Sequence, residues 1–500
     1  MSTIVRVKDY LTSHELARVE VNPQTIQEIS DLFSEIKDGA QYMADDFNIL
    51  QFEDKLQNTM DSTRRKILLQ CGDTISGIND RVLIKHYRDQ YSRLGINLET
   101  HRKYSCDLLT ICGSIRFERH VLRPITKDDR EALLSLENRK TVVPLDKFMK
   151  IDNLPFKATP KAMLEIAWWA TDQLSYQRAT DILQNVFKWD ICQETVRKIS
   201  NYIGKLVTDF DIMNADKLWN LFWNNQLTLG PQSIDGTLYI MIDGAMLHTK
   251  EKDENGTKWR ENKLGIIFSS MHMKPKNVES EKFNFDILKR EYVDYFGSVD
   301  QFQVLLLYAA IRNGYGSHTK TVLVTDGATW ISNMQKTVFP DAIHILDIWH
   351  VIEHLYAFGK IYFKYDEEKY QPWVEEMKEK LVCNEHMDVI AEVQNMTKKF
   401  KEKNFKGLTR EEMSKIKNLP EYLCENKKKI NYHEFRSQGL YIGSGHIESG
   451  NRTVAQDRLK RPGMTWNIDT GQCLLTLRAK KESKLWNSDV EKVVLSHFNL

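Results

Sequence analysis

The 500 residues include 70 Lys and Arg against 69 Asp and Glu, for a net charge of +1, and 41% of them are hydrophobic. This length predicts several domains with cores of their own, and the balanced charge excludes a chain-wide basic field, so any nucleic-acid surface must be local. Seven scattered cysteines without a CxxC pair exclude a disulfide framework and a cysteine-type zinc site.

The first part of the chain is predicted to be a helical region, 1–98, because residues 22–70 repeat apolar side chains every three or four positions. In the next region, 99–150, residues 101–123 predict two strands that turn at Cys112-Gly113-Ser114. The basic residues of the two arms are Arg102, Lys103, Arg116, Arg119 and Arg123. A basic hairpin can lie along a phosphate backbone, but the solvated face of a small sheet explains the pattern equally well.

Residues 151–230 predict a helix-turn-helix domain. Thr159-Pro160 is a good helix start, Ser175 is placed to cap a second helix, and a third helix follows Asp190. The exposed side chains of that third, recognition-type helix are expected to contact DNA: Gln193, Thr195, Arg197 and Lys198. Many three-helix bundles share this pattern without binding DNA, so both interpretations stay open.

Residues 231–350 change to an α/β pattern. One apolar strand, 237–244, ends in Asp243-Gly, and another, 321–327, ends in Asp326-Gly. Ligands of open sheets gather at the carboxyl ends of strands, so the two aspartates are expected to lie at one edge. The other predicted elements are a strand over 263–270, a helix over 299–313 and a strand over 342–350 with Asp347 and His350 at its end.

A lysine-rich helical insertion is predicted over 351–437, followed by a last region over 438–500 that contains Glu448. Three glycines precede this acid, and a helix that starts near Gly445 would direct its amide groups at an anion. Eight basic residues against three acidic ones lie between positions 452 and 484. The four nearest to Glu448 are expected to bind the DNA backbone: Arg452, Arg458, Lys460 and Arg461.

Asp243, Asp326 and Glu448 together supply three hard oxygen ligands. Carboxylates of this kind suit Mg²⁺, and two such ions can stabilise the attacking and the leaving oxygen of a phosphoryl displacement. An Asp-Gly at a strand end is also a common turn, so the spacing alone does not establish a metal site.

Five segments resemble the transposases of bacterial insertion sequences, of the ISLre-two type: MIDGAMLHTK, WRENKLGIIFSS, VLVTDGATWI, LDIWHVIEHL and YIGSGHIESGNRTVAQDRLKRPGMTW. The resemblance implies a multidomain α+β protein, in which a ribonuclease-H-like α/β core with an all-helical insertion follows the helical, hairpin and helix-turn-helix regions. It implies metal-dependent DNA cleavage and strand transfer with Asp243, Asp326 and Glu448 as catalytic acids and ligands of two Mg²⁺ or Mn²⁺ ions. Asp347-x-x-His350 matches a motif of related transposases, which implies a supporting role for His350.

The same resemblance implies double-stranded DNA partners, namely terminal inverted repeats and target DNA, and assembly as a homo-oligomer. No apolar run reaches the length of a membrane span and the N-terminus lacks a signal sequence, so we expect a cytoplasmic, nucleoid-associated protein without a membrane partner.

Two alternatives remain. His350-Val-Ile-Glu353-His354 matches the HxxEH pattern of zinc metallopeptidases. Against this reading, the motif is expected to begin at a strand end, whereas such a zinc site needs a helix already under way. The second alternative is a DNA-binding regulator derived from an inactive transposase, which would have no need of the three acids.

Overall fold

The computed structural model describes residues 27, 30, 31, 34 and 49–498, apart from gaps at 78–79, 228, 230, 255, 276–284 and 403–404. Most of the helical region predicted before residue 49 therefore lies outside the described residues. The chain divides into two compact units. The first contains the chain up to Ile199 together with the segment from Leu495 onward, and the second contains Ser200–Val494. The domain boundaries predicted from the sequence are finer than this division and stay predictions. Within the described ranges, no helix is both long and apolar enough to cross a membrane.

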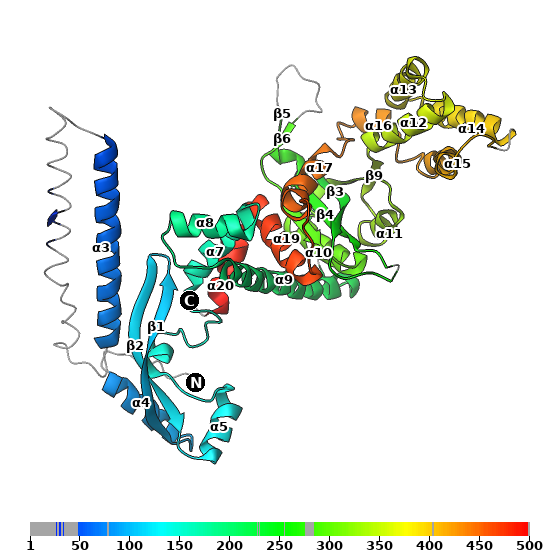
Figure 1. Cartoon of the computed structure of the whole chain (residues 1–500). Coiled ribbons are helices and arrows are strands. Elements are labelled where there is room, and N and C mark those ends of the chain that lie inside the picture. Colours follow the sequence, from blue (N-terminus) through cyan, green and yellow to red (C-terminus); the bar gives the residue numbers. More distant parts are fainter. Residues whose placement is uncertain are drawn as a thin grey trace. The chain divides into compact units, whose positions relative to one another are not determined.

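The first unit contains the predicted hairpin, along which the long helix α3 packs (Figure 1). The hairpin is confirmed, but its turn lies at Ile111-Cys112 and not at Cys112-Gly113-Ser114, because Gly113 and Ser114 already pair with Thr110 and Leu109 in the ladder. The elements of this unit are α3 (Ile49–Gly77), α4 (Asp80–Ser92), β1 (Leu98–Thr110), β2 (Gly113–Pro124), α5 (Lys127–Glu137), α6 (Pro144–Phe148), α7 (Pro160–Asp172) and α8 (Tyr176–Asn185).

Four of the five basic residues predicted for the hairpin pair with acids, and the fifth, Arg102, lies over the ring of Tyr104. Arg123 lies opposite Glu99 in the ladder and binds it at 2.7 Å. Residues directly opposite each other in an antiparallel pair interact most strongly, so this ion pair neutralises positive charge that could otherwise attract DNA. Arg119 is buried, where it pairs with Asp146 and lies over the ring of Tyr104. The hairpin is therefore a charge-paired sheet rather than a uniformly basic surface.

The predicted helix starts at Thr159-Pro160 and Ser175 are confirmed, since both hydroxyls accept a backbone N–H of the first turn. The third helix differs from the prediction. It is α9, Gln193–Trp223, which has 31 residues and is therefore much longer than a typical recognition helix. The helix continues to Trp223, and Ala215 on it belongs to the main core of the second unit.

The second unit is organised around a mixed five-stranded sheet in the order β7-β4-β3-β8-β9. β3 pairs antiparallel with β4, and β4 antiparallel with β7, whereas β3, β8 and β9 run parallel. The strands are β3 (Ile234–His248), β4 (Trp259–Ser269), β7 (Glu291–Tyr295), β8 (His318–Thr325) and β9 (Ile343–Leu346), with a separate two-stranded ribbon of β5 (Met273–Pro275) and β6 (Phe285–Ile287) beyond η3 (Ser270–His272).

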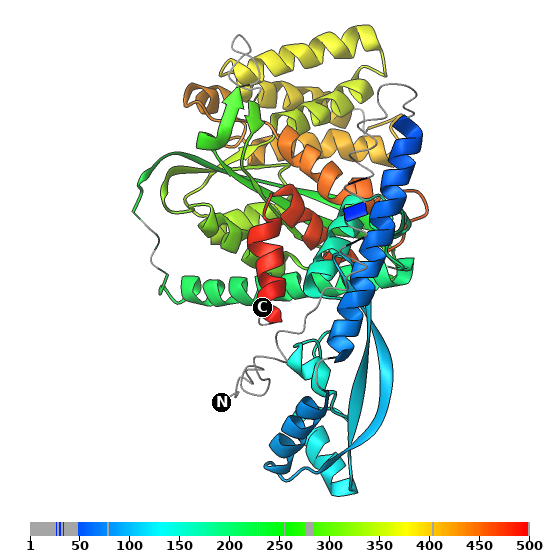
Figure 2. The ribbon, with the colours of Figure 1, turned by 90° about the vertical axis from the view of Figure 1, so that its left-hand side faces the viewer.

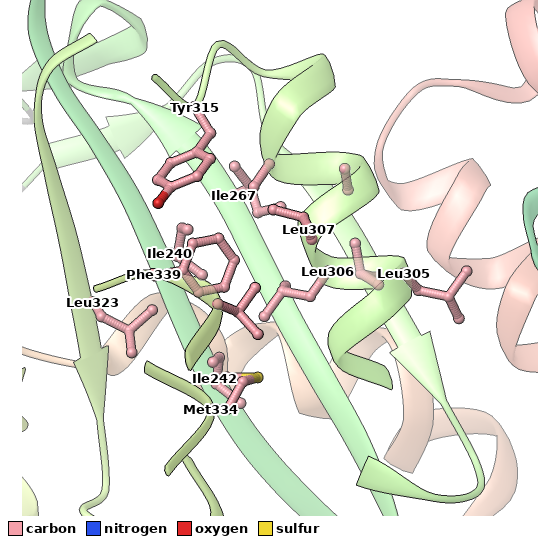
Figure 3. Packing of buried hydrophobic residues seen from close by; sticks show 14 of the residues in the cluster. Ile240, Ile242, Ile267, Leu305, Leu306, Leu307, Tyr315, Leu323, Met334 and Phe339 are labelled. Carbon is pink, nitrogen blue, oxygen red and sulfur yellow. The ribbon is translucent and has the colours of Figure 1, made fainter. Parts of the chain in front are cut away.

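One face of this sheet carries the main hydrophobic core. Ile240 and Ile242, two positions apart on β3, point to the same face and belong to one buried cluster with Leu306 of α10 (Val299–Arg312) and Met334 of α11 (Thr329–Val338). Figure 3 shows these side chains packed between the strands and the helices. By alternation, Asp243 points to the opposite face.

The insertion before Glu448 is helical, as predicted, and its helices lie together as a bundle, yellow to orange in Figure 2. They are α12 (Ile348–Tyr362), α13 (Glu367–Val382), α14 (His386–Glu402), α15 (Arg410–Glu425) and α16 (Tyr432–Ser437). The chain then returns to the face of the sheet opposite the main core, where α17 and the π-helical turn η4 contact β3. The last elements are α17 (Gly445–Gly450), η4 (Asn451–Gln456), α18 (Asp457–Leu459), α19 (Ile468–Glu482), η5 (Trp486–Glu491) and α20 (Lys492–His497).

Candidate active site

The parallel ladder between β3 and β8 brings the two predicted aspartates to one place. The last pair in its register is Ile242 opposite Thr325. The next residue on each chain is an aspartate, so Asp243 and Asp326 lie side by side where the pairing ends. The prediction that Asp243 ends its strand is wrong, because β3 continues to His248 along β4. The parallel pairing ends at this point, and the strand does not.

The Asp-Gly turn after β8 has a local reason. The Asp326 carboxylate accepts the amide of Ala328 at 2.9 Å. Gly327 adopts a φ of +88°, and a Cβ on it would lie 2.6 Å from Cδ1 of Leu346. Only glycine fits both the conformation and the space. Tyr422, from the helical insertion, donates its hydroxyl to the backbone oxygen of Asp326 at 3.1 Å and so fixes the turn from the other side.

Glu448 lies on α17, which begins at Gly445 as predicted. The hydroxyl of Ser444 lies 2.8 Å from the Glu448 carboxylate and 2.7 Å from that of Asp347. A hydroxyl has one proton to donate, so Ser444 serves one carboxylate at a time. Burial raises the pKa of Asp347, against the hydrogen bonds from Ser444, and the charge of Glu448 raises it further. Ser444 thus links Glu448 to Asp347, the residue that caps α12 at the start of the helical insertion, and no sequence pattern indicated this link.

The three predicted acids act on one another electrostatically. Burial raises the pKa of Asp243, and the negative charges of Asp326 and Glu448 raise it further, while hydrogen bonds from Gly244 and Asn451 oppose the rise. The folded chain therefore brings into one electrostatic neighbourhood three carboxylates that are far apart in sequence. Mutual repulsion of this kind is relieved by a cation.

In the part of the chain that the structure describes, no group of three or more His, Cys, Asp or Glu side chains is placed so that it could hold a metal ion, so Asp243, Asp326 and Glu448 do not form a ready metal site. In proteins Mg²⁺ is held by one or two carboxylates and completes its shell with waters and substrate phosphates. The donor set of Asp243, Asp326 and Glu448 fits that chemistry, whereas it does not resemble a structural zinc site.

Asn451 is a site residue that the sequence reasoning missed. Its amide nitrogen donates to Oδ2 of Asp243 at 2.5 Å, and the residue is only 1% exposed. Asn451 follows Glu448 by three positions, which is one of the two spacings that place side chains on the same face of a helix. That spacing is the signal that could have identified it.

His350 belongs to a helix rather than to a strand end. β9 stops at Leu346, and Asp347 caps α12 by accepting the amides of Trp349 and His350. His354 follows one turn later, and the two Nε2 atoms lie 3.1 Å apart. The expected objection to the HxxEH pattern is therefore wrong, because the helix is already under way at its first histidine. Burial lowers the pKa of His354, the neighbouring His350 lowers it too, and Asp326 acts in the opposite direction.

The basic segment after Glu448 is only partly a surface. Arg452, Lys460 and Arg461 are exposed, and Arg461 donates to the backbone oxygen of Asp457. Arg458 is 1% exposed, with its guanidinium 5.3 Å above the ring of Trp466. The expectation that Arg458 contacts the DNA backbone does not agree with this position, because its side chain lies in the protein interior.

The four residues predicted to read DNA lie in the first turns of α9. Gln193 and Lys198 are exposed, and Thr195 and Arg197 are half-buried. Arg197 binds Glu194 at 2.7 Å and holds the pKa of that carboxyl at about 2. Part of the positive charge of this helix start is thus already balanced.

Comparison with models of known protein families gave no match, and comparison with curated proteins found none of significant similarity.

Proposed function

We propose that this protein is a DNA transposase that cleaves and joins DNA strands through Asp243, Asp326 and Glu448. The observation that carries the proposal is the register of the β3–β8 ladder, which ends immediately before Asp243 and Asp326. Glu448 lies on the helix that packs on the same sheet and contributes to the raised pKa of Asp243. A mixed α/β sheet with an all-helical segment before the last acid suits the ribonuclease-H-like core that the sequence resemblance implies.

The proposed reaction has two balanced steps. In hydrolysis, a water oxygen forms a bond to phosphorus, the bond to the 3′-oxygen breaks, and the released strand ends in a 3′-hydroxyl. In strand transfer, that 3′-hydroxyl oxygen forms a bond to a phosphorus of the target strand, the bond from this phosphorus to the target's own 3′-oxygen breaks, and the released 3′-oxygen takes up the proton. The three carboxylates would hold two Mg²⁺ or Mn²⁺ ions, which would supply charge stabilisation for the attacking and leaving oxygens.

The remaining residues of the site orient these acids. Gly327 and Tyr422 fix the turn that carries Asp326, and Ser444 holds Glu448 from the start of its helix. Arg452, four positions after Glu448, and Lys460, later in the same basic segment, supply exposed positive charge for a phosphate backbone. Their contribution to binding would weaken as salt rises.

The decisive experiment uses the full-length protein and a plasmid that carries the DNA flanking its coding sequence. We expect Mg²⁺- or Mn²⁺-dependent nicking that is lost in Asp243→Asn, Asp326→Asn and Glu448→Gln while end binding persists. Asp235→Asn is a matched control, because Asp235 is also followed by glycine on β3 but is exposed near the other end of the strand. Nicking that survives in any of the three variants would remove that residue from the assignment.

One observation favours a zinc site as the second candidate. His350 and His354 lie on one helix face with their Nε2 atoms 3.1 Å apart, which is close to the separation of two ligands on one zinc ion. Zinc bound in stoichiometric amount by the purified protein, together with peptidase activity that is lost in His354→Ala, would favour that reading over the transposase. The DNA-binding regulator would instead bind DNA ends without nicking them.

A further inference from the structure

Asn451 is a buried polar residue in direct contact with one of the proposed catalytic acids, Asp243. Its amide nitrogen donates to Asp243, and its side-chain oxygen is buried with no hydrogen-bond partner among the described residues. An unsatisfied buried oxygen destabilises the folded state, so the core alone gives no reason for an amide at this position. The contact with Asp243 gives one.

The backbone around Asn451 is unusual in the same place. Residues Asn451–Gln456 form a π-helical turn, a geometry found mostly as short segments at functional sites. Arg478 of α19 donates its guanidinium to the backbone oxygens of Thr453 and Val454, within this turn. These bonds satisfy carbonyl groups that the widened turn presents to the interior.

Close packing fixes the start of the turn against the sheet. A Cβ on Gly450 would lie 2.6 Å from Cε1 of Tyr292 and 3.5 Å from Cδ2 of Leu264, so only glycine lets the backbone approach. Leu264 is the residue opposite Asp243 in the antiparallel ladder. The glycine therefore brings the next residue, Asn451, directly over the aspartate.

We propose that Asn451 is a positioning residue that fixes the Asp243 carboxylate for metal binding, and that Arg478 supports it by holding the π-helical turn. This inference rests on the proposed function. Oδ1 of Asp243 accepts the amide of Gly244 at 2.7 Å and Oδ2 accepts Asn451, so both oxygens are oriented while each keeps a lone pair for a cation. An asparagine suits this role because it donates a hydrogen bond without adding a fourth negative charge.

The test measures metal binding without DNA, by Mn²⁺ electron paramagnetic resonance on the full-length protein. Groups that orient metal ligands contribute about 10–100-fold to metal affinity, so Asn451→Ala should weaken Mn²⁺ binding by about that factor with little change in thermal stability. Asn451→Ser serves as the substitute if the alanine variant folds poorly. Its shorter side chain does not reach Asp243, so it should weaken Mn²⁺ binding by a similar factor. Arg478→Lys, which cannot hold both carbonyl groups, should weaken binding in the same direction.

Asn262→Ala is the matched control. Asn262 lies fully buried on β4 with both polar side-chain atoms unpartnered in the described chain, two positions from the residue opposite Asp243. The proposal is overturned if Asn451→Ala binds Mn²⁺ like the wild type, or if Asn262→Ala weakens binding equally. A wild-type protein that binds no Mn²⁺ either alone or together with a DNA end would overturn the proposed function itself, whereas wild-type affinity in Asn451→Ala would overturn only the positioning role.

Discussion

Arg458 provides a test that separates a structural arginine from a DNA-binding one. The sequence places it in a basic run beside Glu448, but the structure buries it over the ring of Trp466, whose indole nitrogen donates to the backbone of Leu459. Trp466 in turn bonds to the backbone of His248 at the end of β3. Arg458→Ala should therefore loosen the packing of the C-terminal segment on the sheet.

The magnitude follows from what the substitution removes. Truncating a long, unbranched buried side chain to alanine costs about 2–5 kcal/mol, and a desolvated cation–π contact accounts for about 2 kcal/mol. Removing the burial cost of the charge offsets part of this loss. We expect the free energy of unfolding of the second unit to fall by about 2–4 kcal/mol, measured as a lower urea midpoint.

DNA binding supplies the contrasting measurement. Lys460→Ala is the matched control, because Lys460 is exposed two positions further on. Its loss should change stability by less than about 0.5 kcal/mol and should reduce the slope of log affinity against log salt by about one. The reasoning fails if Arg458→Ala is as stable as the wild type and reduces the salt slope in the manner of Lys460→Ala.

Three further substitutions test individual features of the second unit. Gly327→Ala should destabilise more than Gly463→Ala in urea titrations, because both have positive φ but only Gly327 is crowded by side chains; equal effects would refute the close approach. Burial lowers the pKa of His344 from 6.5 to about 3, so between these pH values the unfolded chain binds a proton that the folded chain does not, and stability falls as pH falls. At pH 5 this loss amounts to about 2 kcal/mol, and His344→Gln should remove it from the difference between urea midpoints at pH 7 and pH 5. Ser444→Ala should slow nicking about 10–100-fold with normal end binding, whereas the exposed Ser449→Ala should not, and equal rates would exclude a role for the Ser444 hydroxyl.

The sequence predicted which strands and helices form the site better than it predicted the residues at which they begin and end. Two apolar runs that each end in Asp-Gly correctly indicated that Asp243 and Asp326 would meet, because parallel strands expose their carboxyl ends at one edge. The run gave no sign that β3 continues to His248, since that depends on pairing with β4 and not on the local pattern. In the same way, the apolar residues before and after Asp347 conceal the boundary between β9 and α12, which only the capping bonds of that aspartate define.

Burial of charged residues was the other feature that the sequence could not give. Arg458 and Lys460 look alike in a basic segment, yet one is interior and the other exposed. The difference arises because a π-helical turn that contacts β3 is followed by a helix of only three residues, so that successive residues face different surroundings. A regular 3.6-residue period does not predict side-chain directions through such a turn.

The same turn explains why the separation of the three acids along the sequence does not show that they come close together in the fold. Asp243 and Asp326 are adjacent by strand register, a property of the sheet alone. Glu448 reaches them only because the chain, after the whole helical insertion, returns to the face of β3 and β4 opposite the main core. Gly450, tight against Tyr292, and Arg478, bound to the backbone of the turn, fix that return at two points. Substitutions at these two supports are therefore expected to impair metal binding, as we also expect of substitutions of the acids, although neither residue would touch an ion.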